Sequence, residues 1–149
     1  MEGEFCGSRV AVKMFSTGRD GHTGRSVFNE LRILRHVRHP NIALFHGACV
    51  RARSGDIRLV LELIEGKLLS AHIADMQGRE QTLQDFAPRR HVAEDVCLAM
   101  VYLHSRKPAI VHADLKPSNI MVEFREPRDR AKLLDFGLAL AVTRHAKMS

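Results

Sequence analysis

The chain has 149 residues, is 45% hydrophobic and 27% charged, and carries a formal net charge of +6. This size allows one core or two small lobes but excludes a large multidomain enzyme, and no apolar run approaches the roughly 18 residues of a membrane span. Because the positive charge is spread along a chain with one Tyr and no Trp, it favours a solvated basic surface over a nucleic-acid interface.

The first elements predicted along the chain are a strand, a loop and a helix. Residues 8–15 alternate in part and include β-branched residues, so they predict a strand. Residues 16–24 are rich in Gly, Ser and Thr and predict a loop. Apolar residues at helical spacing then predict a helix over residues 26–37, which Pro40 should end because proline disfavours helical geometry in the residue before it.

Two further strands are predicted next, at residues 42–50 and 57–64. The turn-like residues 53–56 separate them, and Gly66 should break the second strand. The first part of the chain is therefore expected to consist of strands with a single helix.

The second part is predicted to be mainly helical. Residues 68–76 predict a short helix, and Pro88 stands where a longer helix can begin. Core-facing apolar residues follow at helical spacing, namely Val92, Val96, Ala99, Met100 and Leu103. Residues 111–124 predict a loop and a short strand, and residues 131–134 predict its hairpin partner. Strands followed by helices indicate an α+β fold with two lobes.

The cysteines and the N-terminal residues indicate the cellular compartment of the protein. Three cysteines, at positions 6, 49 and 97, lie far apart and form no C-x-x-C pair. This spacing favours neither a disulfide framework nor a zinc site. The N-terminal residues lack the charged start and apolar core of a secretory signal. We therefore expect an intracellular, cytoplasmic location.

Two short motifs in the second part carry the strongest functional signal. Residues 112–119 read HADLKPSN, and residues 135–137 read DFG. Protein kinases share H-R-D-L-x-x-x-N followed by D-F-G after a short hairpin. Matches to both motifs arise by chance in about one sequence in a million. The chain therefore resembles a protein kinase, a family that transfers a phosphoryl group from ATP with the help of Mg²⁺.

The resemblance implies roles for the polar residues of these motifs. Asp114 would accept or orient the proton of the attacking hydroxyl, and Lys116 would reach the transferring phosphate. Asn119 and Asp135 would ligate magnesium, a hard cation that prefers oxygen ligands. His112 would hold the loop in place. Each residue alone would more often belong to a surface loop, but together at these offsets they favour a catalytic site.

A second motif, VAVK at residues 10–13, resembles the V-A-I-K strand of kinases. Alone it is weak, because alternating strands often carry a lysine. Glu30 follows 17 residues after Lys13 on the predicted helix, where the glutamate of the kinase αC helix is expected. The resemblance implies that an ion pair with Glu30 holds Lys13 against the α- and β-phosphates.

The same alignment implies an adenine site. Residues 59–66 are similar to a kinase strand and hinge. The implied adenine-binding residues are Ala11 and Met121 on the two faces of the ring, Leu61 as the gatekeeper, and the backbone of Glu62 and Ile64 as hydrogen-bonding partners. The implied regulatory spine consists of Leu34, Phe45, His112 and Phe136.

The acceptor and the regulation are also suggested by the catalytic loop. Residues 45–47 (FHG) and the general pattern are closest to the tyrosine-kinase-like group, which includes Raf-type kinases. A lysine two residues after Asp114 is typical of serine/threonine kinases, so Ser and Thr hydroxyls of protein substrates are the expected acceptors. Ala113 replaces the usual arginine, as in non-RD kinases. We therefore expect no activation through that arginine by phosphorylation of Thr143 or Ser149.

The resemblance implies a truncated, two-lobed kinase fold. Residues 1–66 would form a partial N-lobe with the hinge, and residues 67–149 an upper C-lobe that ends in the activation segment. Neither a G-x-G-x-x-G loop nor an A-P-E motif is present, so we expect this exact chain to be inactive alone. The alternative is a non-catalytic, kinase-like module that binds a kinase or scaffold partner.

Overall fold

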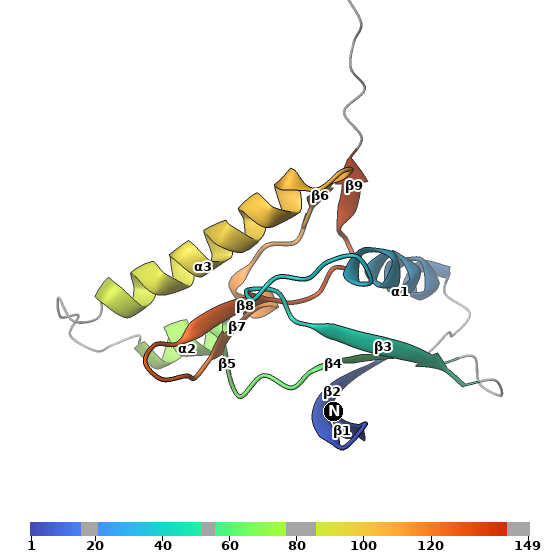
Figure 1. Cartoon of the computed structure of the whole chain (residues 1–149), viewed down its shortest axis with the longest axis horizontal. Helices are drawn as coiled ribbons and strands as arrows, with labels where there is room; N and C mark the ends of the chain where they lie inside the picture. The colour runs from blue at the N-terminus through green and yellow to red at the C-terminus, as the bar shows by residue number, and fades with distance from the viewer. Residues whose placement is uncertain (16–20, 52–55, 77–85, 143–149) are drawn as a thin grey trace, which may run out of the picture.

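A computed structural model describes residues 1–15, 21–51, 56–76 and 86–142 (Figure 1). Within these residues the protein combines antiparallel sheets with helices, so the predicted α+β class is confirmed. Parts of the predicted loop at 16–24 and of the turn at 53–56, together with Thr143 and Ser149, lie outside the described residues. In the part that is described, no helix is long and apolar enough to cross a membrane.

The first sheet has four antiparallel strands in the order β1-β2-β4-β3. Its strands are β1 (Glu2–Phe5), β2 (Ser8–Phe15), β3 (Phe45–Val50) and β4 (Ile57–Glu62). The predicted bounds of β2 are confirmed, whereas β1 was not predicted. Helix α1 (Gly21–Leu34) packs on this sheet through Val27, which is buried with Ile57 and Leu59 of β4.

Helix α1 corrects two predictions. It begins at Gly21, so the loop predicted over 21–24 is wrong. Helix propagation costs far less than nucleation, so packing of the later turns can carry the helix through weak helix formers. It also ends at Leu34 and not at Val37, because the hydrogen bonds after Leu34 shorten to i→i+3 and the Arg38 Nη1 donates to Leu34 O at 2.9 Å.

In the second part of the chain, the described residues form two α-helices and two small sheets. The helices are α2 (Leu69–Met76) and α3 (Phe86–Ser105), and the short 3₁₀ helix η2 spans Pro117–Asn119. The sheets are β5 (Gly66–Leu68) with β7 (Ile120–Glu123) and β8 (Arg130–Leu133), and β6 (Ala109–Val111) with β9 (Leu140–Val142). The predicted hairpin corresponds to β7 and β8. Strands β6 and β9 were not predicted.

Gly66 does not simply end a strand, as predicted, but begins β5. Its partner in β7 is Glu123, far away in sequence. A Cβ atom on Gly66 would lie 1.9 Å from Val122 O, so the two backbones can approach only because this residue has no side chain. The proposed boundary between residues 66 and 67 therefore falls within β5, and the division into two lobes stays a prediction.

The strand predicted over 42–50 is also shorter than expected. Residues 41–43 pair with β8 instead: Leu133 N donates to Asn41 O and Ala43 N donates to Leu133 O. Ile42 accordingly forms an isolated parallel bridge with Leu133. These backbone hydrogen bonds connect residues 41–43, which follow α1, to strand β8 of the β7–β8 hairpin.

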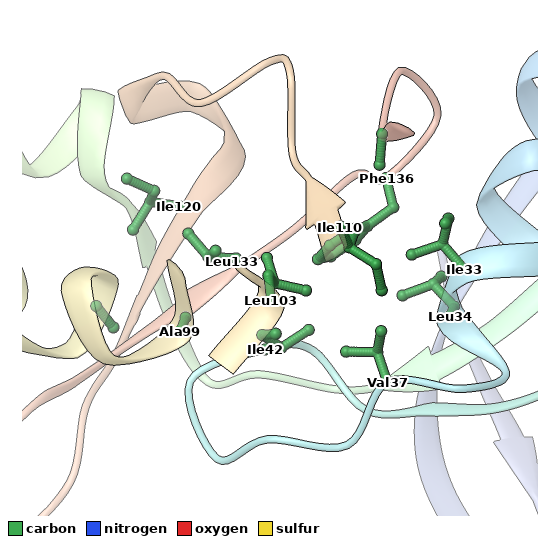
Figure 2. Packing of buried hydrophobic residues seen from close by; sticks show 12 residues of the cluster. Ile33, Leu34, Val37, Ile42, Ala99, Leu103, Ile110, Ile120, Leu133 and Phe136 are labelled. Atoms are coloured by element: carbon green, nitrogen blue, oxygen red, sulfur yellow. The ribbon is translucent and has the colours of Figure 1, made fainter. Parts of the chain in front are cut away.

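One hydrophobic cluster joins the two parts (Figure 2). It includes Ile33 and Leu34 at the end of α1, Leu103 of α3, Leu133 of β8, and Phe136. The predicted stripe on α3 faces this cluster, since Ala99 and Leu103 are fully buried and Val92, Val96 and Met100 pack against it. The same core therefore fixes α1 relative to the segment that follows β8.

A buried carboxylate adds a polar anchor to this core. Asp95 of α3 accepts a hydrogen bond from Ala131 N at 2.9 Å and one from Arg128 Nη2 at 3.2 Å. Its side chain is almost fully buried, so both partners are needed to offset its desolvation. This contact holds the β7–β8 hairpin against α3.

The β1–β2 turn predicts that Cys6→Asn stabilises the protein. Cys6 and Gly7 have φ values of +50° and +77°, and a two-residue turn with positive φ at both positions favours Asn-Gly. A left-handed backbone costs an ordinary residue about 1 kcal/mol, so we expect a gain of about 0.5–1 kcal/mol in the free energy of unfolding. The urea midpoint measures this gain. Cys97→Asn on the exposed face of α3 is the control, and an equal gain there would contradict the turn argument.

Candidate active site

A cavity of about 290 Å³ opens between the four-stranded sheet and the β7–β8 hairpin. Nine of the residues that the sequence predicted for the site line it, namely Ala11, Lys13, Glu30, Leu61, Glu62, Ile64, Asn119, Met121 and Asp135. Lys116 and Asp114 are not in this wall, but Asn119 connects them to it. The structure therefore brings residues from most of the length of the chain to one place.

Lys13 lies at the centre of the polar end of the cavity. Its Nζ atom lies 3.0 and 2.9 Å from the two carboxylate oxygens of Glu30, and 3.0 Å from Asp135 Oδ1. Strand β2 supplies the lysine, α1 the glutamate, and the segment after β8 the aspartate. One ammonium group thus connects three separate elements.

Glu30 is the most buried member of this group, with a side chain only 1% exposed, whereas Lys13 is 32% exposed. Burial raises the pKa of Glu30, and the Lys13 charge opposes that rise. The Lys13 charge therefore favours the ionised form of this buried carboxylate, against the effect of burial.

The catalytic-loop motif is anchored by His112, which is fully buried. Its Nε2 lies 2.9 Å from Leu134 O, and its Nδ1 accepts from Asp114 N at 3.4 Å. These partners fit a neutral ring with its proton on Nε2. The ring also contacts Phe136, with centroids 4.9 Å apart. His112 thus links the loop to the residues on either side of Asp135.

Asp114 is held by short-range contacts within its own loop. Its Oδ2 accepts from Asn119 Nδ2 at 2.8 Å and lies 2.8 Å from Lys116 Nζ. The hydrogen bond from Lys116, followed by that from Asn119, lowers the pKa of Asp114 below its ordinary value. Asp114 is therefore a carboxylate throughout the neutral range.

Asp135 has a left-handed backbone, with φ of +54°. Its Oδ1 accepts from Gly137 N at 3.1 Å and contacts Lys13, which leaves Oδ2 to meet a cation. Asn119 uses Nδ2 to donate to the carboxylate and the backbone oxygen of Asp114. Its amide oxygen is therefore its remaining ligand atom.

The backbone that should bind adenine is fixed by a buried ion pair that the sequence analysis missed. Glu62 Oε2 lies 2.5 Å from Nζ of Lys132, whose side chain is 7% exposed, and Glu62 Oε1 accepts from Leu44 N at 2.7 Å. The Glu62 N–H donates to Leu44 O, so only its carbonyl remains for adenine. No local signal marks Lys132, because its partner lies 70 residues away.

Four other residues of the cavity wall were not assigned to the site from the sequence, although Leu63 and Ser118 lie within its motifs: Ala43, Leu63, Ser118 and Leu134. Leu134 could have been found, because it directly precedes the DFG motif at the end of a predicted strand. Of the implied spine, Leu34 and Phe136 share one buried cluster and Phe45 packs against it. Ala113 has a φ of +61°, an uncommon backbone conformation for alanine.

Comparison with known proteins agrees with this geometry. The family model described as "Protein kinase domain" matches residues 5–149. This chain belongs to that family. Similar relatives include the serine/threonine-protein kinase CTR1 of Arabidopsis thaliana, with 37% identity over 91% of this chain and 16% of its own length. The receptor protein kinase WSS1 of Oryza sativa subsp. japonica has 35% identity over 92% of this chain and 15% of its own length.

A third relative is the dual specificity protein kinase shkA of Dictyostelium discoideum, with 34% identity over 87% of this chain and 23% of its own length. The chain spans less than a quarter of each of these three relatives. The resemblance to protein kinases is therefore confirmed at the level of the family. Protein kinases as a family use ATP and Mg²⁺.

The ion pair of this kinase chain predicts a pH-dependent loss of stability in Lys13→Met. Removing the ammonium should raise the pKa of Glu30 further and lower the free energy of unfolding by about 3 kcal/mol at pH 7. A carboxyl whose pKa is raised by folding favours the folded state at low pH, and this contribution is lost as pH rises through the folded pKa. The deficit relative to wild type should therefore be larger at pH 8 than at pH 5.

Urea denaturation at pH 5, 6, 7 and 8 measures this deficit. The double variant Lys13→Met/Glu30→Gln is the matched control, because it removes the titrating carboxyl and should show a deficit that hardly changes with pH. A Lys13→Met deficit of equal size at every pH would contradict the assignment of a buried, lysine-dependent carboxylate.

Proposed function

We propose that the natural protein containing this chain transfers the γ-phosphoryl group of ATP to Ser and Thr hydroxyls of protein substrates. The observation that carries this proposal is the Lys13 ammonium, within 3.0 Å of Glu30 and Asp135 at the polar end of the cavity. The loop with Asp114 is connected to the same cavity through Asn119. Family membership supports the same reaction.

The apolar part of the cavity suits an adenine ring. Its volume, about 290 Å³, is near the lower end of the range for small-molecule sites. Ala11 and Met121 would contact the two faces of the ring, with Leu61 at its edge. The carbonyl oxygen of Glu62 would accept from the adenine amino group, and the N–H of Ile64 would donate to a ring nitrogen. Lys13 would then bind the α- and β-phosphates.

The polar residues fit magnesium in its usual protein setting. Mg²⁺ is typically held by one or two side-chain oxygens together with phosphate oxygens and water. Asn119 and Asp135 each have an oxygen for this purpose, and among the described residues no cluster of three or more His, Cys, Asp or Glu forms an all-protein cage. When bound, Mg²⁺ would neutralise charge on the β- and γ-phosphates.

The catalytic loop would bind and orient the acceptor. The Asp114 carboxylate uses Oδ2 for Asn119 and Lys116, so Oδ1 is left to accept the hydrogen bond of the substrate hydroxyl. As the hydroxyl oxygen bonds to phosphorus, the bond from phosphorus to ADP breaks and the hydroxyl proton passes to Asp114. Lys116 would balance the charge on the transferring group. The low pKa of Asp114 suits orientation of the hydroxyl more than early removal of its proton.

Phosphoryl transfer by the full natural protein tests this function. With labelled ATP, Mg²⁺ and a general protein substrate, Asp135→Asn and Asp114→Asn should each reduce transfer by at least about 100-fold, because each removes a charge from the reacting centre. Asp75→Asn, an exposed Asp-to-Asn change on α2, is the control and should stay within about twofold of wild type. Phosphoamino-acid analysis of the product identifies the acceptor.

Two results would change the proposal. Labelled phosphotyrosine beside phosphoserine would extend the acceptor class to tyrosine, which is the kind of activity that the name of the dual specificity relative describes for that protein. A wild-type protein that binds ATP but transfers no phosphate would contradict the enzyme and favour a kinase-like binding module.

Ala113 leads to a prediction about regulation. In many kinases an arginine at this position forms charge-assisted hydrogen bonds to a phosphate on the activation segment. Ala113 has only a methyl group and cannot form them. Thr143→Glu in the full natural protein should therefore leave kcat within about twofold of wild type. Thr143→Gln is the matched neutral control. A severalfold rise in kcat for Thr143→Glu but not for Thr143→Gln would contradict this prediction and indicate that another residue pairs with a negative charge at position 143.

A further inference from the structure

The Asn29 side chain of α1 binds the backbone that follows Asp135. Its Nδ2 donates to Ala139 O at 2.6 Å and to Gly137 O at 3.1 Å, and it lies 3.5 Å from Phe136 O. The acceptors are all main-chain carbonyls more than 100 residues away in sequence. Asn29 therefore recognises the path of this segment and not the identity of its side chains.

The orientation of the Asn29 amide is fixed from its other side. Its Oδ1 accepts from Arg32 Nη2 at 3.0 Å. The opposite orientation would place an oxygen against a group of carbonyl oxygens and an NH₂ group against a guanidinium. Arg32 therefore supports the donor role of Asn29.

The segment fits closely against α1. A Cβ atom on Gly137 would lie 2.4 Å from Ser26 Oγ, one helical turn before Asn29. Phe136 and Ala139 are fully buried, and Ala139 N donates to Phe136 O. The segment is thus a tight turn, and the carbonyl oxygens of Gly137 and Ala139 accept hydrogen bonds from the helix side chain of Asn29.

The same turn of α1 controls Asp135 in two ways. Glu30, next to Asn29, holds Lys13, which contacts Asp135 Oδ1. Asn29 holds the carbonyl of Gly137, whose N–H donates to the same Asp135 oxygen. A displacement of α1 would therefore weaken the charge contact and the backbone contact together.

We propose that Asn29 is a positioning residue that couples the placement of α1 to the ability of Asp135 to hold the metal–nucleotide complex. This inference rests on the proposed function, because it assigns Asp135 to metal binding. Asn29 itself touches neither nucleotide nor substrate. Its loss should therefore affect the contribution of Mg²⁺ to nucleotide affinity and leave adenine recognition unchanged.

Nucleotide binding with and without Mg²⁺ tests the coupling in the full natural protein. The variant Asn29→Leu keeps the approximate shape but removes the hydrogen bonds, and Asn29→Asp places a carboxylate against the carbonyl oxygens. In Asn29→Leu, affinity for a fluorescent ATP analogue in EDTA should stay within about twofold of wild type. The gain in affinity on adding Mg²⁺ should fall about tenfold, the size expected when one or two hydrogen bonds are lost.

Asn29→Asp should lose at least as much of the Mg²⁺-dependent gain. Phe28→Ala is the matched control, because this neighbouring side chain is 65% exposed, and it should keep the full gain. Hydrogen–deuterium exchange of the nucleotide-free protein gives a second measurement. The backbone amides of Gly137 and Ala139 should exchange faster in both Asn29 variants than in wild type or the control.

The outcomes separate this inference from the proposed function. A wild-type protein that binds no nucleotide would overturn both. Two results would overturn the coupling alone. In the first, wild type gains affinity on adding Mg²⁺ and Asn29→Leu keeps the same gain. In the second, Asn29→Leu loses as much nucleotide affinity in EDTA as it does with Mg²⁺. If the Asn29 variants do not fold, Arg32→Ala, which removes only the group that orients the amide, should show a smaller loss of the gain. An unchanged gain in Arg32→Ala would then overturn the inference.

Discussion

The ammonium of Lys13 between two carboxylates is the interaction on which the rest of the candidate site depends. Glu30 is almost completely buried, and a buried carboxylate is costly unless a cation and hydrogen bonds compensate it. Asp135 shares the same cation at 3.0 Å. Strand β2, helix α1 and the segment after β8 must therefore all be in place before the three charges are partnered together.

Apolar packing supplies that placement. The end of α1 contributes Ile33 and Leu34 to the same cluster that buries Phe136, directly after Asp135 (Figure 2). The free energy gained by burying these side chains also brings Glu30 and Asn29 to the segment they contact. One packing arrangement therefore forms both the core and the site. A change in the position of α1 would disturb the apolar cluster and the contacts of Glu30 and Asn29 together.

The two halves of the site differ in how they are held. Asp114, Lys116 and Asn119 lie within six residues and bind one another directly, so the loop geometry is largely local. The adenine side depends instead on a long-range contact, because Lys132 of β8 binds Glu62 at the end of β4. A buried lysine paired in this way fixes the relative position of two strands more narrowly than apolar contacts alone.

The sequence by itself determined the family, nine of the residues that line the cavity, strand β2 and the core-facing stripe of α3, since these depend on short motifs and on local periodicity. Only the tertiary structure decided the start of α1, the short strands β5, β6 and β9, the Lys132–Glu62 pair and the hold of Asn29 on the segment after Asp135. The physical reason is the same in each case. Three-residue strands and single polar contacts gain their stability from partners distant in the chain, and a local pattern does not encode those partners.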